Sequence, residues 1–217
     1  MPSHAARLAA LTLALAASLT SPGLSQEPGD FDFYVLALSW SPSYCLAEGP
    51  DANRQQCGGD TDFGFIVHGL WPQFETGYPE YCRSPEPERV DRTLGENYFD
   101  IMPSMGLIGH QWRKHGTCSG LDHEAYFDLV RDAHEAVRVP NGLVDAEQTE
   151  TVTQDAVEAA FVTANPGLDR AGIAVTCDRD NLREVRICLT RDLGFRSCPE
   201  VDADACPRAT MTLPASD

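Results

Sequence analysis

The sequence has few basic residues: 16 Lys and Arg stand against 33 Asp and Glu, which gives a formal net charge of −17. A protein that holds a polyanion over its whole surface is basic, because its affinity comes from neutralising phosphates. Net charge therefore gives no support for nucleic-acid binding and favours solubility. Any site for a polyanion must be a local basic patch within an acidic surface.

Long apolar runs are also scarce, and the clearest lies at the N-terminus, from Leu8 to Leu19. This run is too short to span a membrane, and Arg7 before it and small residues after it are typical of a secretory signal. The alternative is a buried N-terminal helix. We expect residues 1–25 to be a signal peptide and residues 26–217 to form a single domain. The mature protein is then expected to be secreted or periplasmic, without membrane attachment.

The sequence has no CxxC pair, which disfavours a structural zinc site. Its cysteines are even in number and all follow the apolar run. In an exported chain such a set predicts disulfides, although counting does not give their connectivity. The eight cysteines are Cys45, Cys57, Cys82, Cys118, Cys177, Cys188, Cys198 and Cys206.

The hydrophobic pattern predicts strands and helices in irregular order. Because there is no regular alternation of strand and helix, the pattern favours an α+β fold over a doubly wound one. Residues 78–92 are predicted to be a loop. The segment from Gly69 to Pro72 is predicted to end the second strand. The predicted strands cover residues 31–40, 63–68, 173–177 and 184–190, and the predicted helices residues 96–102, 110–118, 125–137 and 148–164.

The segment from His110 to Cys118 carries the most chemistry. On a helix, its two histidines share one face, within about 140°, with an amide, an ammonium and a cysteine. Such a face suits a phosphate-like anion, because a lysine supplies fixed charge and histidines exchange protons. The residues of this face are His110, Gln111, Lys114, His115 and Cys118.

This face has three other possible interpretations. A solvated polar face is the default, but the apolar sequence before it and the cysteine on it favour burial. A zinc pair is disfavoured because His110 and His115 are not four residues apart. A cysteine hydrolase built on Cys118 and His115 is disfavoured because that thiol is expected to be consumed in a disulfide.

A further histidine, His68, lies at the end of an apolar strand. Taken alone, a histidine in such a place is more often a core residue than a catalyst.

Two segments, FIVHGLWPQ and HQWRKHGTC, resemble the active-site segments HGLWP and HEWxKHGTC of the ribonuclease T2 family, in the family's order. The resemblance extends to the opening FDFYVLALSWSPSYC and to the cysteine layout, so it covers nearly all of the mature chain. The chain resembles a secreted bacterial-type member. The family fold is α+β, with a central antiparallel β-sheet flanked by helices and disulfide-bonded.

The resemblance implies an endoribonuclease that cleaves single-stranded RNA without metal or cofactor. The RNA 2′-hydroxyl attacks the adjacent phosphorus, and a 2′,3′-cyclic phosphate forms, so DNA is not a substrate. By position, His115 resembles the general base, His68 the general acid, and Lys114 and His110 the phosphate-binding residues. Two histidines in these roles predict a bell-shaped pH dependence.

The resemblance also implies base-binding residues and disulfides. Trp71 matches an aromatic residue that stacks on a base, and Tyr78 or Tyr81 supplies a second face. Stacking tolerates every base, so we expect low base specificity. Gln73 stands where the family often has an acidic residue, so no base preference is carried over from the family. The implied disulfides are Cys45–Cys57, Cys82–Cys118, Cys177–Cys206 and Cys188–Cys198.

Gln111 departs from the family pattern, which has Glu there. An amide still donates a hydrogen bond to a phosphoryl oxygen but carries neither negative charge nor a mobile proton. We therefore expect catalysis to be slower or its pH dependence to be shifted. We also expect the protein to be a monomer. The main alternative is a catalytically weakened relative that binds RNA or a protein. A metal-dependent phosphodiesterase is disfavoured by the shortage of clustered ligands.

Overall fold

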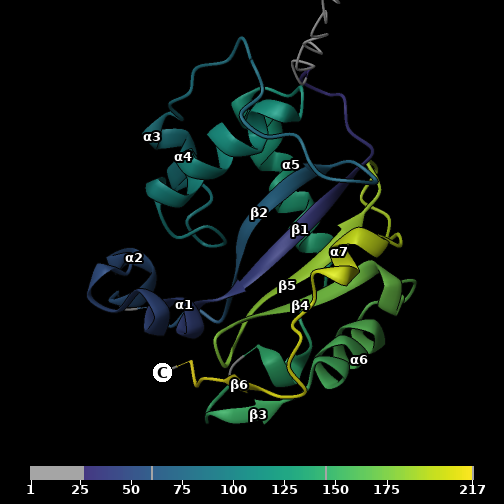
Figure 1. Ribbon diagram of the computed structural model, residues 1–217. Coiled ribbons are helices and arrows are strands. Elements are labelled where there is room, and N and C mark those ends of the chain that lie inside the picture. Colours follow the sequence, from purple (N-terminus) through teal and green to yellow (C-terminus); the bar gives the residue numbers. More distant parts are fainter. Residues whose placement is uncertain (1–26, 60, 145, 217) are drawn as a thin grey trace, which may run out of the picture.

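The computed structural model describes residues 27–59, 61–144 and 146–216, so the expected signal peptide, residues 1–25, lies outside the described residues. The described part folds around a six-stranded sheet with helices packed beside it (Figure 1). This confirms the α+β prediction. Within this part, no helix is both long enough and apolar enough to cross a membrane.

The sheet is antiparallel except at one contact. Its strands run in the order β2 (Phe65–Gln73), β1 (Phe33–Trp40), β5 (Asn181–Leu189), β6 (Met211–Leu213) and β3 (Glu150–Val152), and β4 (Ile173–Asp178) also pairs with β5. The exception is β6, which meets β5 in parallel where Asn181 pairs with Thr212. Strand β2 therefore forms one edge of the sheet.

The helices begin at capping residues that the sequence places before them. Ser104, Asp122 and Thr153 each accept a backbone N–H in the first turn of a helix, as N-caps do. The helices are α1 (Ser41–Glu48), α2 (Arg54–Cys57), α3 (Arg92–Glu96), α4 (Met105–Lys114), α5 (His123–Ala136), α6 (Gln154–Ala164) and α7 (Pro199–Ala203). Single 3-10 turns lie at η1 (Gly49–Asp51), η2 (Gly116–Cys118), η3 (Asn141–Leu143) and η4 (Arg170–Gly172).

The two faces of the sheet are covered differently. One face packs under α4, α5 and α6 and forms the main core, with Leu36 from β1, Val67 from β2 and Ile187 from β5 fully enclosed. The other face holds a small apolar cluster beside α7, which includes Val35 and Cys188. The small cluster leaves the rest of that face available for a pocket.

Several predicted boundaries were wrong. The helix predicted at residues 110–118 begins at Met105, because Ser104 caps it, and ends at Lys114 before a 3-10 turn. The helix predicted at residues 96–102 lies earlier, at Arg92–Glu96, because Asp91 caps it.

The start predicted for the long helix at residues 148–164 was also wrong. Helix α6 begins at Gln154, because Glu150–Val152 pairs with Met211–Leu213 as a strand instead. Strand β2 was predicted to end at His68 but continues to Gln73. Pro72 is tolerated there because β2 is an edge strand, where a missing N–H costs no ladder bond.

Four disulfides pair all eight cysteines: Cys45–Cys57, Cys82–Cys118, Cys177–Cys206 and Cys188–Cys198. These are the pairs that the resemblance implies. The second spans 36 positions and ties the loop after Tyr78 to the end of α4. In the chain-entropy account, closing such a loop stabilises the fold by about 4 kcal/mol.

Candidate active site

A cavity of about 410 Å³ opens between β2, β5, the end of α4 and α7. It gathers most of the side chains singled out from the sequence, although they come from distant parts of the chain. Those that line it are His68, Trp71, Tyr78, His110, Gln111, Lys114 and His115. The cavity also contains residues that sequence reasoning missed: Arg183, Glu184 and Arg186 from β5, and Glu200 and Asp204 near α7.

His68 lies at a β-bulge in β2. Ala37 of β1 pairs with Gly69 and Leu38 pairs with Val67, so His68 is an extra residue without a partner. A bulge re-aims the side chains that follow it. Val67 and Leu70 consequently both face the main core, while His68 and Trp71 both face the cavity, with ring centroids 5.4 Å apart. In a regular strand, His68 and Leu70 would share a face.

Glu184 holds the ring of His68. The Nδ1 atom of His68 forms a short contact with Oε1 of Glu184, whose side chain is 2% exposed. Burial opposes ionisation of Glu184, but the hydrogen bond from His68 and the positive charges of His68 and Arg186 outweigh it and lower the carboxyl pKa to about 2. Because Nδ1 is occupied, Nε2 is the ring nitrogen of His68 that a ligand can reach.

His115 has the opposite environment. It is buried, and its ring is stacked on Trp71 with centroids 5.1 Å apart. Burial, the largest cause, and the positive charges of Lys114, His68 and His110 together lower its pKa to about 3. Its Nδ1 has no hydrogen-bond partner among the described residues. His115 is therefore a neutral imidazole at physiological pH.

Lys114 and His110 lie one helical turn apart on α4 and supply positive charge and donors. The Nζ atom of Lys114 is 3.6 Å from Oε2 of Glu80 and 5.6 Å from the centre of the Tyr78 ring. Burial lowers the pKa of His110, and the charges of His68 and Lys114 lower it further. A phosphate entering the cavity would meet both side chains.

Gln111 is almost fully buried and is oriented by Trp71. The indole Nε1 of Trp71 donates to Oε1 of Gln111 at 2.8 Å. Because an indole N–H can only donate, the amide oxygen must face Trp71, and the amide nitrogen is left as a donor. Gly69 makes room for this pair, since a Cβ there would lie 2.1 Å from Oε1 of Gln111 and 2.3 Å from Nε1 of Trp71.

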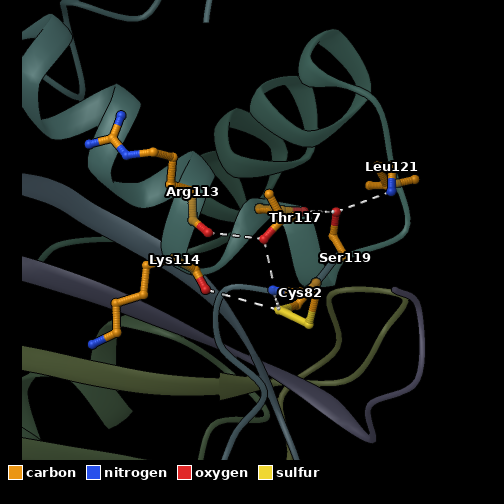
Figure 2. The surroundings of a disulfide bond; sticks show 8 residues. Cys82, Arg113, Lys114, Thr117, Ser119 and Leu121 are labelled. Atoms are coloured by element: carbon orange, nitrogen blue, oxygen red, sulfur yellow. Dashed lines mark hydrogen bonds between the residues drawn. A yellow bond between two sulfur atoms is a disulfide. The ribbon is translucent and has the colours of Figure 1, made fainter. Parts of the chain in front are cut away.

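The disulfide Cys82–Cys118 secures the end of α4, where His115 begins the next turn. Figure 2 shows the bond beside the carbonyl groups of Arg113 and Lys114, with the Lys114 side chain pointing away from it. Thr117 Oγ1 donates to the Arg113 carbonyl at 3.0 Å, and Tyr81 N donates to the Lys114 carbonyl at 2.9 Å. The helix end that presents Lys114 is thus fixed through its backbone.

The two tyrosines proposed for base binding differ in position. Tyr78 lines the cavity and is 45% exposed, so its ring is accessible. Tyr81 is 60% exposed but does not line the cavity, and its φ of 51° turns the chain toward Cys82. Trp71 contacts His115 and carries the Arg186 guanidinium over its ring at 5.4 Å, so its ring is already in contact with site residues.

The signal for the missed residues was present in the sequence. Strand β5 contains Glu184 and Arg186, which period two places on one face, opposite the apolar Val185 and Ile187. A second bulge lies beside them: Thr176 pairs with Glu184 and Cys177 with Leu182, which leaves Arg183 without a partner. Two charges alternating with core residues in a buried strand would have indicated the site.

The charge around the cavity is balanced apart from the histidines. Three basic side chains (Lys114, Arg183 and Arg186) and three acidic ones (Glu184, Glu200 and Asp204) line it. A chain of formal charge −17 therefore presents a locally neutral pocket, to which protonated histidines add positive charge. Among the described residues, no group of three or more His, Cys, Asp or Glu side chains could hold a metal ion.

Known proteins resemble this chain in sequence. A description of the ribonuclease T2 family matches residues 31–198. The chain is 36% identical to a ribonuclease of Aeromonas hydrophila over 170 residues, which cover 76% of this chain and 75% of that protein.

Solved structures share the fold. An RNase-related protein from Calystegia sepium superposes with a TM-score of 0.67 at 20% identity, covering 86% of this chain and 98% of that one. RNase NT, solved in complex with 5′-AMP, superposes with a TM-score of 0.60 at 24% identity, covering 86% and 99%. At these identities, the two structures support the fold alone.

Proposed function

Because the chain belongs to the ribonuclease T2 family and is an endoribonuclease, we propose that it cleaves single-stranded RNA by metal-independent transesterification through a 2′,3′-cyclic phosphate. The observation that carries the proposal is the pair of imidazoles in one cavity with opposite surroundings. His68 contacts an ionised buried carboxylate, whereas His115 is buried beside cations. Environments that separate two titratable groups assign one as acid and the other as base.

In the proposed first step, neutral His115 takes the proton of the 2′-hydroxyl as the oxygen attacks phosphorus. The imidazolium of His68 gives a proton to the departing 5′-oxygen. Lys114 and His110 bind the non-bridging phosphoryl oxygens, and the Gln111 amide donates to one of them. The step leaves His115 protonated and His68 neutral. Attack of water on the cyclic phosphate, with the roles exchanged, restores both.

The nucleophile explains the choice of nucleic acid. DNA lacks the 2′-hydroxyl, so it cannot react. Tyr78 offers an exposed ring for stacking, and Trp71 lies beside the reacting groups. Stacking tolerates every base, which supports low base specificity.

We further propose that the protein acts as a monomer outside the cytoplasm, either secreted or in the periplasm. Four disulfides support this location, because they persist in oxidising compartments. A cell fractionation that recovers the activity from the periplasm or medium tests it. Recovery from the cytoplasm would contradict it.

One assay tests the mechanism. Purified protein is incubated with single-stranded RNA with and without EDTA, and the product termini are analysed for a 2′,3′-cyclic phosphate. The proposal predicts cleavage with this terminus and its loss in His115→Ala. No cleavage would favour the alternative, a catalytically weakened RNA- or protein-binding relative, while cleavage that EDTA abolishes would indicate a metal-dependent phosphodiesterase.

A further inference from the structure

Glu184 is a buried carboxylate whose two oxygens are both bound to side chains of the cavity. Oε1 contacts Nδ1 of His68, and Oε2 accepts from Nε and Nη2 of Arg186 at 3.2 and 3.1 Å. Its side chain is 2% exposed, and it lies between the exposed Arg183 and the core residue Val185 on β5. A buried charge is costly unless it is paired, and breaking such a pair leaves the cost uncompensated.

Arg186 prevents the carboxylate from turning away from His68. Its guanidinium holds Oε2 from one side and lies over the Trp71 ring, which in turn donates to Gln111. The carboxylate is therefore fixed from two directions. An imidazole that donates Nδ1–H to a fixed acceptor has a single orientation, with Nε2 toward the cavity.

Glu184 is the carboxylate in contact with the ring of His68. The other charged side chains and histidines of the cavity carry both signs of charge: Arg183 and Arg186 from β5, His110 and Lys114 from α4, His115 just after α4, and Glu200 and Asp204 near α7. Because an opposite charge in direct contact favours the charged form of a group, Glu184 is the carboxylate placed to stabilise a positive charge on the ring.

We infer that Glu184, held by Arg186, is a positioning residue that orients His68 and stabilises its imidazolium, so that proton donation to the leaving oxygen depends on this carboxylate. The inference rests on the proposed role of His68 as general acid. It assigns no contact between Glu184 and the substrate. It predicts that only reactions whose leaving group needs a proton depend on Glu184.

Two substrates distinguish a role of Glu184 in proton donation from a purely structural role. A dinucleoside phosphate such as UpA expels a 5′-alkoxide, which needs a proton as it leaves. Uridine 3′-(4-nitrophenyl phosphate) expels a phenolate, which leaves without one. Both need the same attack by the 2′-oxygen, so His115 serves both equally.

The experiment compares kcat and KM of the full chain and of Glu184→Gln on both substrates. With UpA, kcat should fall on the order of 10²-fold, the lower range for general acid catalysis, while KM changes little. With the nitrophenyl ester, kcat should stay within about 3-fold of wild type, since no proton is donated in that step. Glu184→Asp, which keeps the charge but withdraws it from the ring, should show the same selectivity to a smaller degree.

Glu158→Gln is the matched control. Glu158 is 4% exposed on α6 and pairs with Arg170, but it does not line the cavity. Its loss removes an equally buried carboxylate, so it reports the cost of burial alone. We expect both substrates to be cleaved at wild-type rates.

The outcomes distinguish this inference from the proposed function. Equal losses on both substrates in Glu184→Gln and Glu184→Asp, or no loss on either, would overturn the role of Glu184. His68→Asn should show the strongest selectivity for the nitrophenyl ester. If wild type cleaves neither substrate, or if His68→Asn affects both equally, the proposed function itself fails.

Discussion

At the scale of single residues, burial and nearby cations determine how His115 titrates. Burial and then the nearby cations lower the pKa of His115 to about 3, and the neutral Gln111 amide adds no negative charge to oppose them. His115 is therefore able to accept a proton well below the usual histidine range. The acidic limb of kcat/KM, which reports the base in the free enzyme, should lie at correspondingly low pH.

Gln111→Glu should move that acidic limb to higher pH. A carboxylate beside His115 favours its imidazolium and raises its pKa, so the base is lost earlier as the pH falls. The measurement is the pH dependence of kcat/KM on UpA for both proteins. Gln55→Glu, on the exposed surface of α2, adds the same charge away from the cavity and should leave the limb unchanged. Coincident acidic limbs for wild type and Gln111→Glu would contradict this account.

Gly69→Ala should damage the site without touching a titrating group. The added methyl would lie 2.1 Å from Gln111 Oε1 and 2.3 Å from Trp71 Nε1, so the hydrogen bond between them must break. Overpacking costs about 1–3 kcal/mol, and displaced site residues lower kcat by on the order of 10²-fold. Gly142→Ala, where the methyl meets nothing within 4 Å, is the control. Wild-type kcat in Gly69→Ala would show that the Gln111–Trp71 pair is dispensable.

At the scale of elements, the sequence predicted the existence of the main strands and helices better than their ends. Residues 125–137 and 173–177 match α5 and β4 closely, because strong apolar periodicity and clear turns mark them. The end of β2 could not be predicted, because a proline inside a strand is tolerated only at a sheet edge. Which strand forms the edge is settled by tertiary pairing.

The site was predictable where motifs carry it, whereas on β5 the sequence offers only alternating charges, and strand pairing decides which partners these charges meet. His68, His110, Lys114 and His115 stand in the two recognisable segments and meet in the cavity. Glu184 was missed because its role depends on the register of β5 against β1, in which it pairs with Ser39. The bulge that turns His68 and Trp71 to the same face is likewise a property of pairing rather than of the β2 sequence alone.

The disulfide at the end of α4 should matter for catalysis as well as stability. Replacing Cys82 and Cys118 with alanine should lower the free energy of unfolding by about 4 kcal/mol, from the length of the loop it closes. It should also lower kcat, because the end of α4 presents Lys114 and His115. Urea unfolding and kcat, measured at a temperature where the variant is folded, check both effects.

The Cys45–Cys57 disulfide provides the matched comparison. It closes a shorter loop across α1 and α2, away from the cavity, and its removal should cost about 3 kcal/mol. We expect kcat to be unchanged once the variant is folded. Equal losses of kcat in the two double variants would show that the helix end needs no covalent restraint.

At the scale of the whole molecule, an acidic protein must admit a polyanion through a locally neutral pocket. The side chains with fixed positive charge that line it are few, namely Lys114, Arg183 and Arg186. Each phosphate contact with a single strand contributes about −0.7 to the slope of log affinity against log salt, so the slope should not exceed about −2 in magnitude. RNA binding measured with a His115→Ala variant over a range of salt concentrations tests this. A slope several times steeper would indicate an extended basic surface.

In the proposed mechanism, the 2′-hydroxyl attacks phosphorus with His115 as base and His68 as acid. The most direct test uses an oligodeoxynucleotide that contains one ribonucleotide, incubated in EDTA and analysed by mass spectrometry. We expect one cut, on the 3′ side of that ribose, with a 2′,3′-cyclic phosphate on the upstream fragment. Cleavage at a deoxynucleotide, or a 3′-hydroxyl at the cut, would contradict it.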